Sequence, residues 1–126
     1  DTLMLTMGSM GETAATAVDE MRKAGRKVGL VKLRLWRPFP VEEFKAAIGG
    51  CKTLIVMDRA ISTGGAGGPV ATDVKSILYG EKKKPRVLNV IAGLGGRDLT
   101  VKDFVAMFDL AKKKKDETFE IYGVRE

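Results

Sequence analysis

The chain has 126 residues with a formal net charge of +6, and its 44% hydrophobic and 30% charged residues are typical of one globular domain with its own core. It contains no histidine and a single cysteine, Cys51, which excludes histidine-based catalysis, histidine metal sites and an internal disulfide within this chain. One cysteine also cannot hold an iron–sulfur cluster by itself.

The sequence shows neither an apolar run near the roughly 20 residues that span a membrane nor a signal peptide. Together with the lone cysteine, this leads us to expect a cytoplasmic protein without membrane contacts. The first residue is Asp1 and an apolar run follows at once. We therefore expect the chain to be a piece of a longer polypeptide.

Alternating apolar runs and helical patterns predict the fold class. The strand-like runs lie near residues 2–7, 28–33, 53–57 and 87–91. Apolar residues at helical spacing run from Ala14 to Ala24, Val41 to Ile48, Val70 to Leu78 and Val101 to Phe108. The alternating segment Thr118–Tyr122 predicts a short edge strand. Strands that alternate with helices predict a three-layer α/β/α domain with a mainly parallel sheet, but they leave the strand order open.

Local signals mark where the helices begin and end. Ser9 and Glu12 form a capping-box pattern before the first helix, and Gly25 is suited to its end. Pro69 is suited to the first turn of the third helix. Thr100, with Asp103 three residues later, begins the fourth helix in the same way as Ser9 and Glu12.

The positive charge is concentrated in two lysine runs, Lys82–Lys84 and Lys112–Lys115. Both lie beside predicted helix ends, where cations complement the helix dipole and are solvated. No aromatic residues interleave them, as base stacking would require. We therefore do not expect nucleic-acid binding.

The segment Gly8–Thr13 follows the first strand and opens the first helix. Such a position can bind phosphate through backbone N–H groups, and the segment resembles the phosphate loop of flavodoxins. Met10 replaces an expected hydroxyl residue, however, and Glu12 would lie near the phosphate. Helix capping explains Ser9 and Glu12 without a ligand, and a flavodoxin-like FMN-binding electron-transfer domain is the alternative.

The segment Leu33–Pro40 contains two prolines and two aromatic residues. It predicts a stiff turn that presents Arg34 and Arg37. The aromatic residues either cap the core or, beside the arginines, form an interface, and the interface is slightly favoured.

Two glycine-rich segments follow the third and fourth strands. Asp58–Pro69 includes Arg59, Ser62 and four glycines, and Gly93–Asp98 ends in an Arg/Asp pair. The glycines of the first segment are Gly64, Gly65, Gly67 and Gly68. The carboxyl edge of a parallel sheet is where such loops bind ligands or partners, so both segments predict a docking surface. The alternatives are a plain strand-to-helix loop and local salt bridges within each Asp/Arg pair.

Four segments in register resemble one family. They are Met7–Thr13, Lys27–Pro40, Met57–Pro69 and Gly93–Thr100, and the ending Tyr122–Glu126 is also similar. The chain resembles the transketolase C-terminal-like domain, domain II, of the α subunit of pyruvate:ferredoxin oxidoreductases. The segments favour the pyruvate branch of the family over the 2-oxoglutarate branch.

The resemblance implies a mostly parallel five-stranded sheet with one antiparallel strand. It also implies an enzyme that converts pyruvate and coenzyme A to acetyl-CoA, CO₂ and reduced ferredoxin, using thiamine diphosphate with Mg²⁺ and iron–sulfur clusters. In this family the thiamine site is built by the preceding domain of the α subunit and by the β subunit, and the clusters lie on other subunits or domains. The partners that the resemblance implies are the preceding thiamine-binding domain and the β, γ and δ subunits, with ferredoxin contacting the other subunits. We therefore expect this domain to bind no cofactor or metal and to be inactive alone.

The sequence thus predicts a support and assembly role, with no catalytic residue in this chain. The residues expected to contact the neighbouring domain or subunits share positions on strand-terminal loops. They are Arg34, Arg37, Asp58, Arg59, Ser62, Gly64, Gly65, Gly67, Gly68, Arg97 and Asp98.

Overall fold

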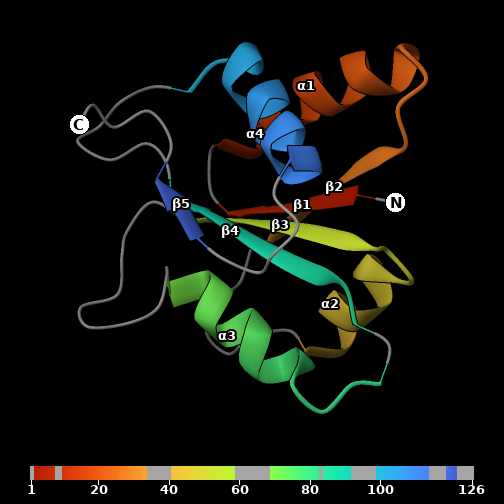
Figure 1. Cartoon of the computed structure of the whole chain (residues 1–126). Coiled ribbons are helices and arrows are strands. Elements are labelled where there is room, and N and C mark those ends of the chain that lie inside the picture. The colour runs from red at the N-terminus through yellow and green to blue at the C-terminus, as the bar shows by residue number, and fades with distance from the viewer. Residues whose placement is uncertain are drawn as a thin grey trace.

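Strands and helices alternate along the whole chain (Figure 1). The computed structural model describes residues 2–7, 10–33, 41–58, 69–82, 84–91, 99–113 and 119–121. The strands are β1 (Thr2–Met7), β2 (Val28–Leu33), β3 (Thr53–Asp58), β4 (Arg86–Ile91) and β5 (Phe119–Ile121). The helices are α1 (Met10–Lys23), α2 (Val41–Ile48), α3 (Pro69–Leu78) and α4 (Val101–Lys113). The predicted edge strand near the end of the chain is therefore present as the three-residue β5.

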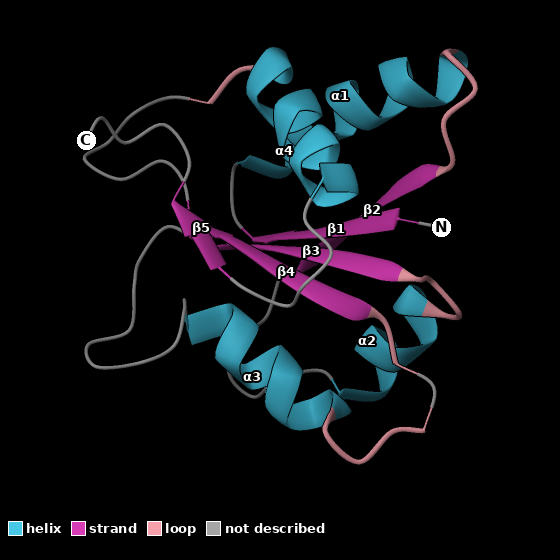
Figure 2. Cartoon of the chain, in the orientation of Figure 1, coloured by secondary structure: helices cyan, strands magenta, loops and turns pink. Residues whose placement is uncertain are grey.

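The sheet has the order β2-β1-β3-β4-β5 (Figure 2). Every described strand pair is parallel, including β4 with β5. The antiparallel strand that the resemblance implied is therefore wrong for the described sheet. The physical reason is that a helix precedes each strand after the first, and a crossover helix returns the chain to the same end of the sheet.

Helices cover both faces of this sheet, which confirms the predicted three-layer α/β/α class. In Figure 1, α1 and α4 lie on one face, and α2 and α3 lie on the other. The side chains of β3 alternate between the two cores: Ile55 and Met57 belong to the core under α1 and α4, and Leu54 and Val56 to the core under α2 and α3. A strand buried on both faces reads as a continuous apolar run, which is why the sequence pattern was clear.

Local turns connect the helices to the next strands. Gly25 follows α1 with φ of +88°, and its N–H donates to the Arg22 carbonyl while the Arg26 N–H donates to the Met21 carbonyl. This pair of bonds is the Schellman motif, and it confirms Gly25 as the predicted helix stop. Gly49 also adopts positive φ, directly after α2.

Within the described ranges, no helix combines the length and apolar character needed to cross a bilayer.

Candidate functional site at the carboxyl edge of the sheet

All five strands end at the same edge of the sheet because all are parallel. The predicted docking segments begin directly after β2, β3 and β4. The strand order therefore brings the starting points of the segments together at one edge, although they are far apart in sequence. Most of the predicted contact residues fall outside the described residues. These are Arg34, Arg37, Arg59, Ser62, Gly64, Gly65, Gly67, Gly68, Arg97 and Asp98.

Asp58 is the predicted contact residue that the structure describes, and its side chain lies inside the domain. It is the last residue of β3 and is only 3% exposed. Its Oδ1 accepts a hydrogen bond of 2.9 Å from the Val70 N–H, and its Oδ2 accepts one of 3.1 Å from the Ala71 N–H. The carboxylate thus joins the end of β3 to the start of α3. Asp58 can therefore influence a surface contact only through the segment whose two ends it holds.

The start of α3 explains why a distant carboxylate is needed. The residue before the helix is Gly68, which has no side chain to accept a hydrogen bond, and Pro69 has no backbone N–H. Val70 and Ala71 therefore carry the first free amides, which a capping side chain normally satisfies. Asp58 takes this role from another element, and its charge is favourable at the positive end of the helix dipole.

Asn89 on β4 completes this arrangement, and the sequence reading missed it. It is 0% exposed. Its Nδ2 donates to Asp58 Oδ2 at 3.0 Å and to the Val56 carbonyl at 2.9 Å. The sequence did carry a signal for this residue, because an asparagine side chain lies inside the apolar run Val87–Ile91. A polar side chain buried in such a run requires hydrogen-bond partners.

Burial raises the pKa of the Asp58 carboxyl above its ordinary value. The hydrogen bonds from Val70, Ala71 and Asn89 act in the opposite direction, and the nearby Asp73 adds a smaller upward effect. Removal from water is thus the dominant influence on this group. A carboxylate held in this way is suited to fixing the backbone around it.

The segment after β4 also leads into a helix with a dedicated cap. Thr100 N–H donates to Asp103 Oδ2 at 2.8 Å, and Asp103 N–H donates to Thr100 Oγ1 at 3.3 Å. These reciprocal bonds confirm the predicted start of α4. Both glycine-rich segments therefore run from the end of a buried strand to a helix whose first turn is fixed by an aspartate.

At the start of α1, the structure gives Glu12 a partner that the sequence did not predict. Its Oε1 lies 3.2 Å from Lys32 Nζ near the end of β2. Ser9, the other half of the predicted capping box, lies outside the described residues. The carboxylate of Glu12 places negative charge in the first turn of α1, which opposes the binding of an FMN phosphate there. Flavodoxins share this strand order, but a shared fold does not imply a shared cofactor.

The described residues offer no ligand set for a metal ion or an iron–sulfur cluster. No group of three or more histidine, cysteine, aspartate or glutamate side chains in the described part of the chain could hold a metal ion. Iron–sulfur clusters bind through several thiolates, and Cys51 is the single cysteine of the sequence. No step of the thiamine or redox chemistry is therefore assigned to these side chains.

Comparison with known proteins gives a consistent result over nearly the whole chain. Residues 1–104 match the family model described as pyruvate:ferredoxin oxidoreductase core domain II. The chain is 35% identical over 126 residues to pyruvate synthase subunit PorA of Methanocaldococcus jannaschii, covering all of this chain and 31% of that protein. It is 44% identical over 113 residues to ketoisovalerate oxidoreductase subunit VorA of Pyrococcus furiosus, covering 90% of this chain and 28% of that protein.

A third relative extends the range of named substrates. The chain is 40% identical over 98 residues to the alpha subunit of NADH-dependent phenylglyoxylate dehydrogenase of Aromatoleum evansii, covering 78% of this chain and 24% of that protein. The chain thus spans about a third or less of these relatives. The matches confirm the resemblance seen in the sequence and give no support to the FMN-binding alternative.

Proposed function

The chain belongs to the pyruvate:ferredoxin oxidoreductase core domain II family, and from this we propose that it is a non-catalytic support and assembly domain of the α subunit of a 2-oxoacid:ferredoxin oxidoreductase. The family match over residues 1–104 is the observation that carries this proposal. The whole enzyme would convert pyruvate and coenzyme A to acetyl-CoA, CO₂ and reduced ferredoxin in the cytoplasm. Thiamine diphosphate with Mg²⁺ would supply the carbanion chemistry, and iron–sulfur clusters would carry the electrons.

The relatives support a role that does not select the substrate. Their names specify pyruvate, ketoisovalerate and phenylglyoxylate, which are all 2-oxo acids with different side chains. Because this chain is 35–44% identical to subunits of enzymes with different named substrates, a task that those enzymes share suits it better than substrate selection. Bracing the thiamine-binding domain and contacting the β, γ and δ subunits is such a task. Ferredoxin would dock on the other subunits.

We assign the contacts to the loops at the carboxyl edge. Arg34 and Arg37 follow β2, Arg59 and Ser62 follow β3, and Arg97 with Asp98 follow β4. Arginine is enriched among residues that dominate interface energies. The glycines at 64, 65, 67 and 68 would admit a neighbouring backbone. Asp58 would act from inside the domain, by fixing both ends of the glycine-rich segment.

The test uses the complete multi-subunit enzyme with the variants Arg59→Ala and Arg97→Ala. Subunit assembly is measured by native mass spectrometry, thermal stability by calorimetry, and turnover by ferredoxin reduction with saturating pyruvate and coenzyme A. We expect weakened assembly or stability for both variants, because arginine is enriched among the interface residues whose truncation costs about 2 kcal/mol or more.

Arg22→Ala is the matched control, because Arg22 is exposed in the last turn of α1, at the opposite end of that helix from the carboxyl edge. It should leave assembly unchanged. If Arg59→Ala and Arg97→Ala leave assembly, stability and turnover all at the level of the control, the assignment of contacts to this edge is wrong.

A further inference from the structure

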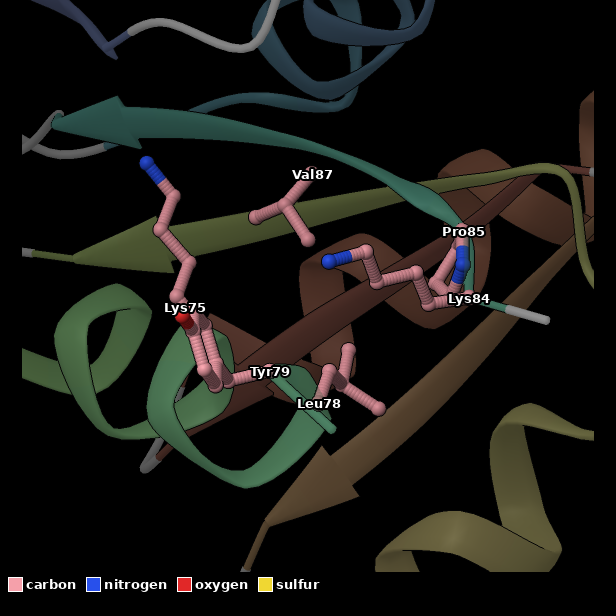
Figure 3. A pocket seen from close by; sticks show the side chains of 6 residues that line it. All are labelled: Lys75, Leu78, Tyr79, Lys84, Pro85 and Val87. Carbon is pink, nitrogen blue, oxygen red and sulfur yellow. The ribbon is translucent and has the colours of Figure 1, made fainter. Parts of the chain in front are cut away.

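A small hollow lies at the opposite, amino edge of the sheet, between the end of α3 and the start of β4. Its volume is about 130 Å³. Figure 3 shows the side chains around it, with Lys75 on one side and Lys84 beside Pro85 on the other. The residues that line it are Lys75, Leu78, Tyr79, Lys84, Pro85 and Val87. Leu78 and Val87 are 4% and 3% exposed and form an apolar floor.

The charge around this hollow is positive. Two of its six lining side chains are lysines, and none is acidic. The acidic residues nearest to these lysines in sequence, Asp73 and Glu81, do not line the hollow, and Glu81 is paired with Lys45 at 2.8 Å. Lys82 adds a further exposed cation beside it. The ammonium groups of Lys75 and Lys84 are therefore not neutralised by a carboxylate in the wall of the hollow.

Tyr79 gives the hollow an aromatic rim. It is 84% exposed, whereas the other large hydrophobic side chains whose burial the structure describes are buried or partly buried. The Lys84 ammonium lies 5.9 Å from the centre of its ring, within the range of a cation–π contact. This contact holds a cation and an aromatic face side by side at the surface. Exposed tyrosines of this kind are enriched at protein interfaces.

The size of the hollow indicates the kind of ligand. Small-molecule sites typically enclose about 300–1,000 Å³, and this hollow is well below that range. It can receive one side chain from a partner while acidic groups on either side meet the lysines. We propose that Lys75, Tyr79 and Lys84 form a docking point for an acidic segment of a partner protein. The proposal uses none of the residues assigned to the carboxyl edge and does not depend on the proposed function.

The experiment measures binding of a fluorescein-labelled peptide, in which a leucine lies between two runs of glutamate, to the 126-residue chain by fluorescence anisotropy at low salt. The double variant Lys75→Gln/Lys84→Gln should weaken binding about fivefold or more, because it removes both charges that face the peptide. Tyr79→Ala should weaken it about threefold. Binding should fall as salt is added.

Lys23→Gln/Lys102→Gln is the control pair, because both lysines are exposed, on α1 and α4, and their loss changes the net charge equally. This pair should change the Kd by less than about twofold. If the control pair weakened peptide binding equally, net charge alone would explain the effect and the proposal would be overturned. So would a uridine oligonucleotide or inorganic phosphate that binds at Lys75 and Lys84 more tightly than the peptide does.

Discussion

The two edges of the sheet are held together in different ways. At the amino edge, turns such as the one from Met21 to Arg26 close within a few residues, and the part-buried Arg86 guanidinium donates to the Ala111 carbonyl at 2.6 Å. At the carboxyl edge, Asp58 bonds to residues 12 and 13 positions later, and Asn89 reaches Asp58 across 31 positions. Both edges thus use long-range polar contacts, but the carboxyl edge is fixed by the buried carboxylate of Asp58, and the amino edge by local turns together with the part-buried guanidinium of Arg86.

This difference has a functional meaning under the proposed role. A long glycine-rich segment has many backbone conformations, so its ends must be fixed if it is to meet a partner in one arrangement. The Asp58 carboxylate fixes both ends at once, because it lies at the end of β3 and bonds to the first amides of α3. The amino edge instead presents the hollow between the end of α3 and the start of β4.

Replacing Asp58 gives the largest expected effect. Asp58→Ala leaves the amides of Val70 and Ala71 and the side chain of Asn89 without their shared acceptor. We expect the free energy of unfolding to fall by about 2–4 kcal/mol, measured by urea denaturation. Asp19→Ala, which removes an exposed carboxylate from α1, should change it by less than about 0.5 kcal/mol. Equal losses of unfolding free energy for the two substitutions would contradict the structural role of Asp58.

Asn89→Leu should have the next largest effect. It removes the donor to Asp58 and Val56 while roughly keeping the buried volume, and we expect a loss of about 1–2 kcal/mol. In the double variant Asp58→Ala/Asn89→Leu, the combined loss should be smaller than the sum by about 1 kcal/mol, since each removes the same bond. Strict additivity would show that the two side chains are not energetically coupled.

Gly25→Ala tests the local turn at the amino edge. Gly25 has φ of +88°, and a side chain in this region is strained by about 1 kcal/mol. The matched control is Gly80→Ala, which lies after α3, has no positive φ and has open space around an added Cβ. A loss of thermal stability confined to Gly25→Ala is expected. The prediction fails if both alanines lower the melting temperature equally.

The smallest effect concerns the pH dependence. Burial raises the pKa of Asp58 in the folded state, so the folded chain binds this proton more tightly than the unfolded chain does. The resulting stabilisation is fully present below the ordinary aspartate value of about 3.9 and is lost as the pH rises through the folded pKa. The difference in unfolding free energy between wild type and Asp58→Asn should therefore decline with rising pH across this window. A difference that grows with pH would mean that the hydrogen bonds outweigh burial.

The difference between local and distant contacts, which occur at both edges, explains what could be predicted from the sequence. The stop at Gly25 and the cap of Thr100 with Asp103 are encoded within a few residues, and both were predicted. The strand order and the bond between Asp58 and Asn89 depend on elements that meet only in the folded chain. From the sequence we therefore treated Asp58 and Arg59 as a surface pair, although the side chain of Asp58 is buried. The antiparallel strand was wrong because it was inferred from the resemblance, whereas a crossover helix precedes each described strand after the first.

Hydrogen–deuterium exchange tests the central proposal most directly, by comparing the isolated chain with the same chain in the complete enzyme. If the carboxyl edge contacts the neighbouring domain and subunits, peptides covering residues 34–40, 59–68 and 92–98 should exchange more slowly in the enzyme. Peptides from the exposed face of α1 around Asp19 serve as the internal control and should change little. Equal exchange of the three loop segments in the isolated chain and in the enzyme would contradict the account.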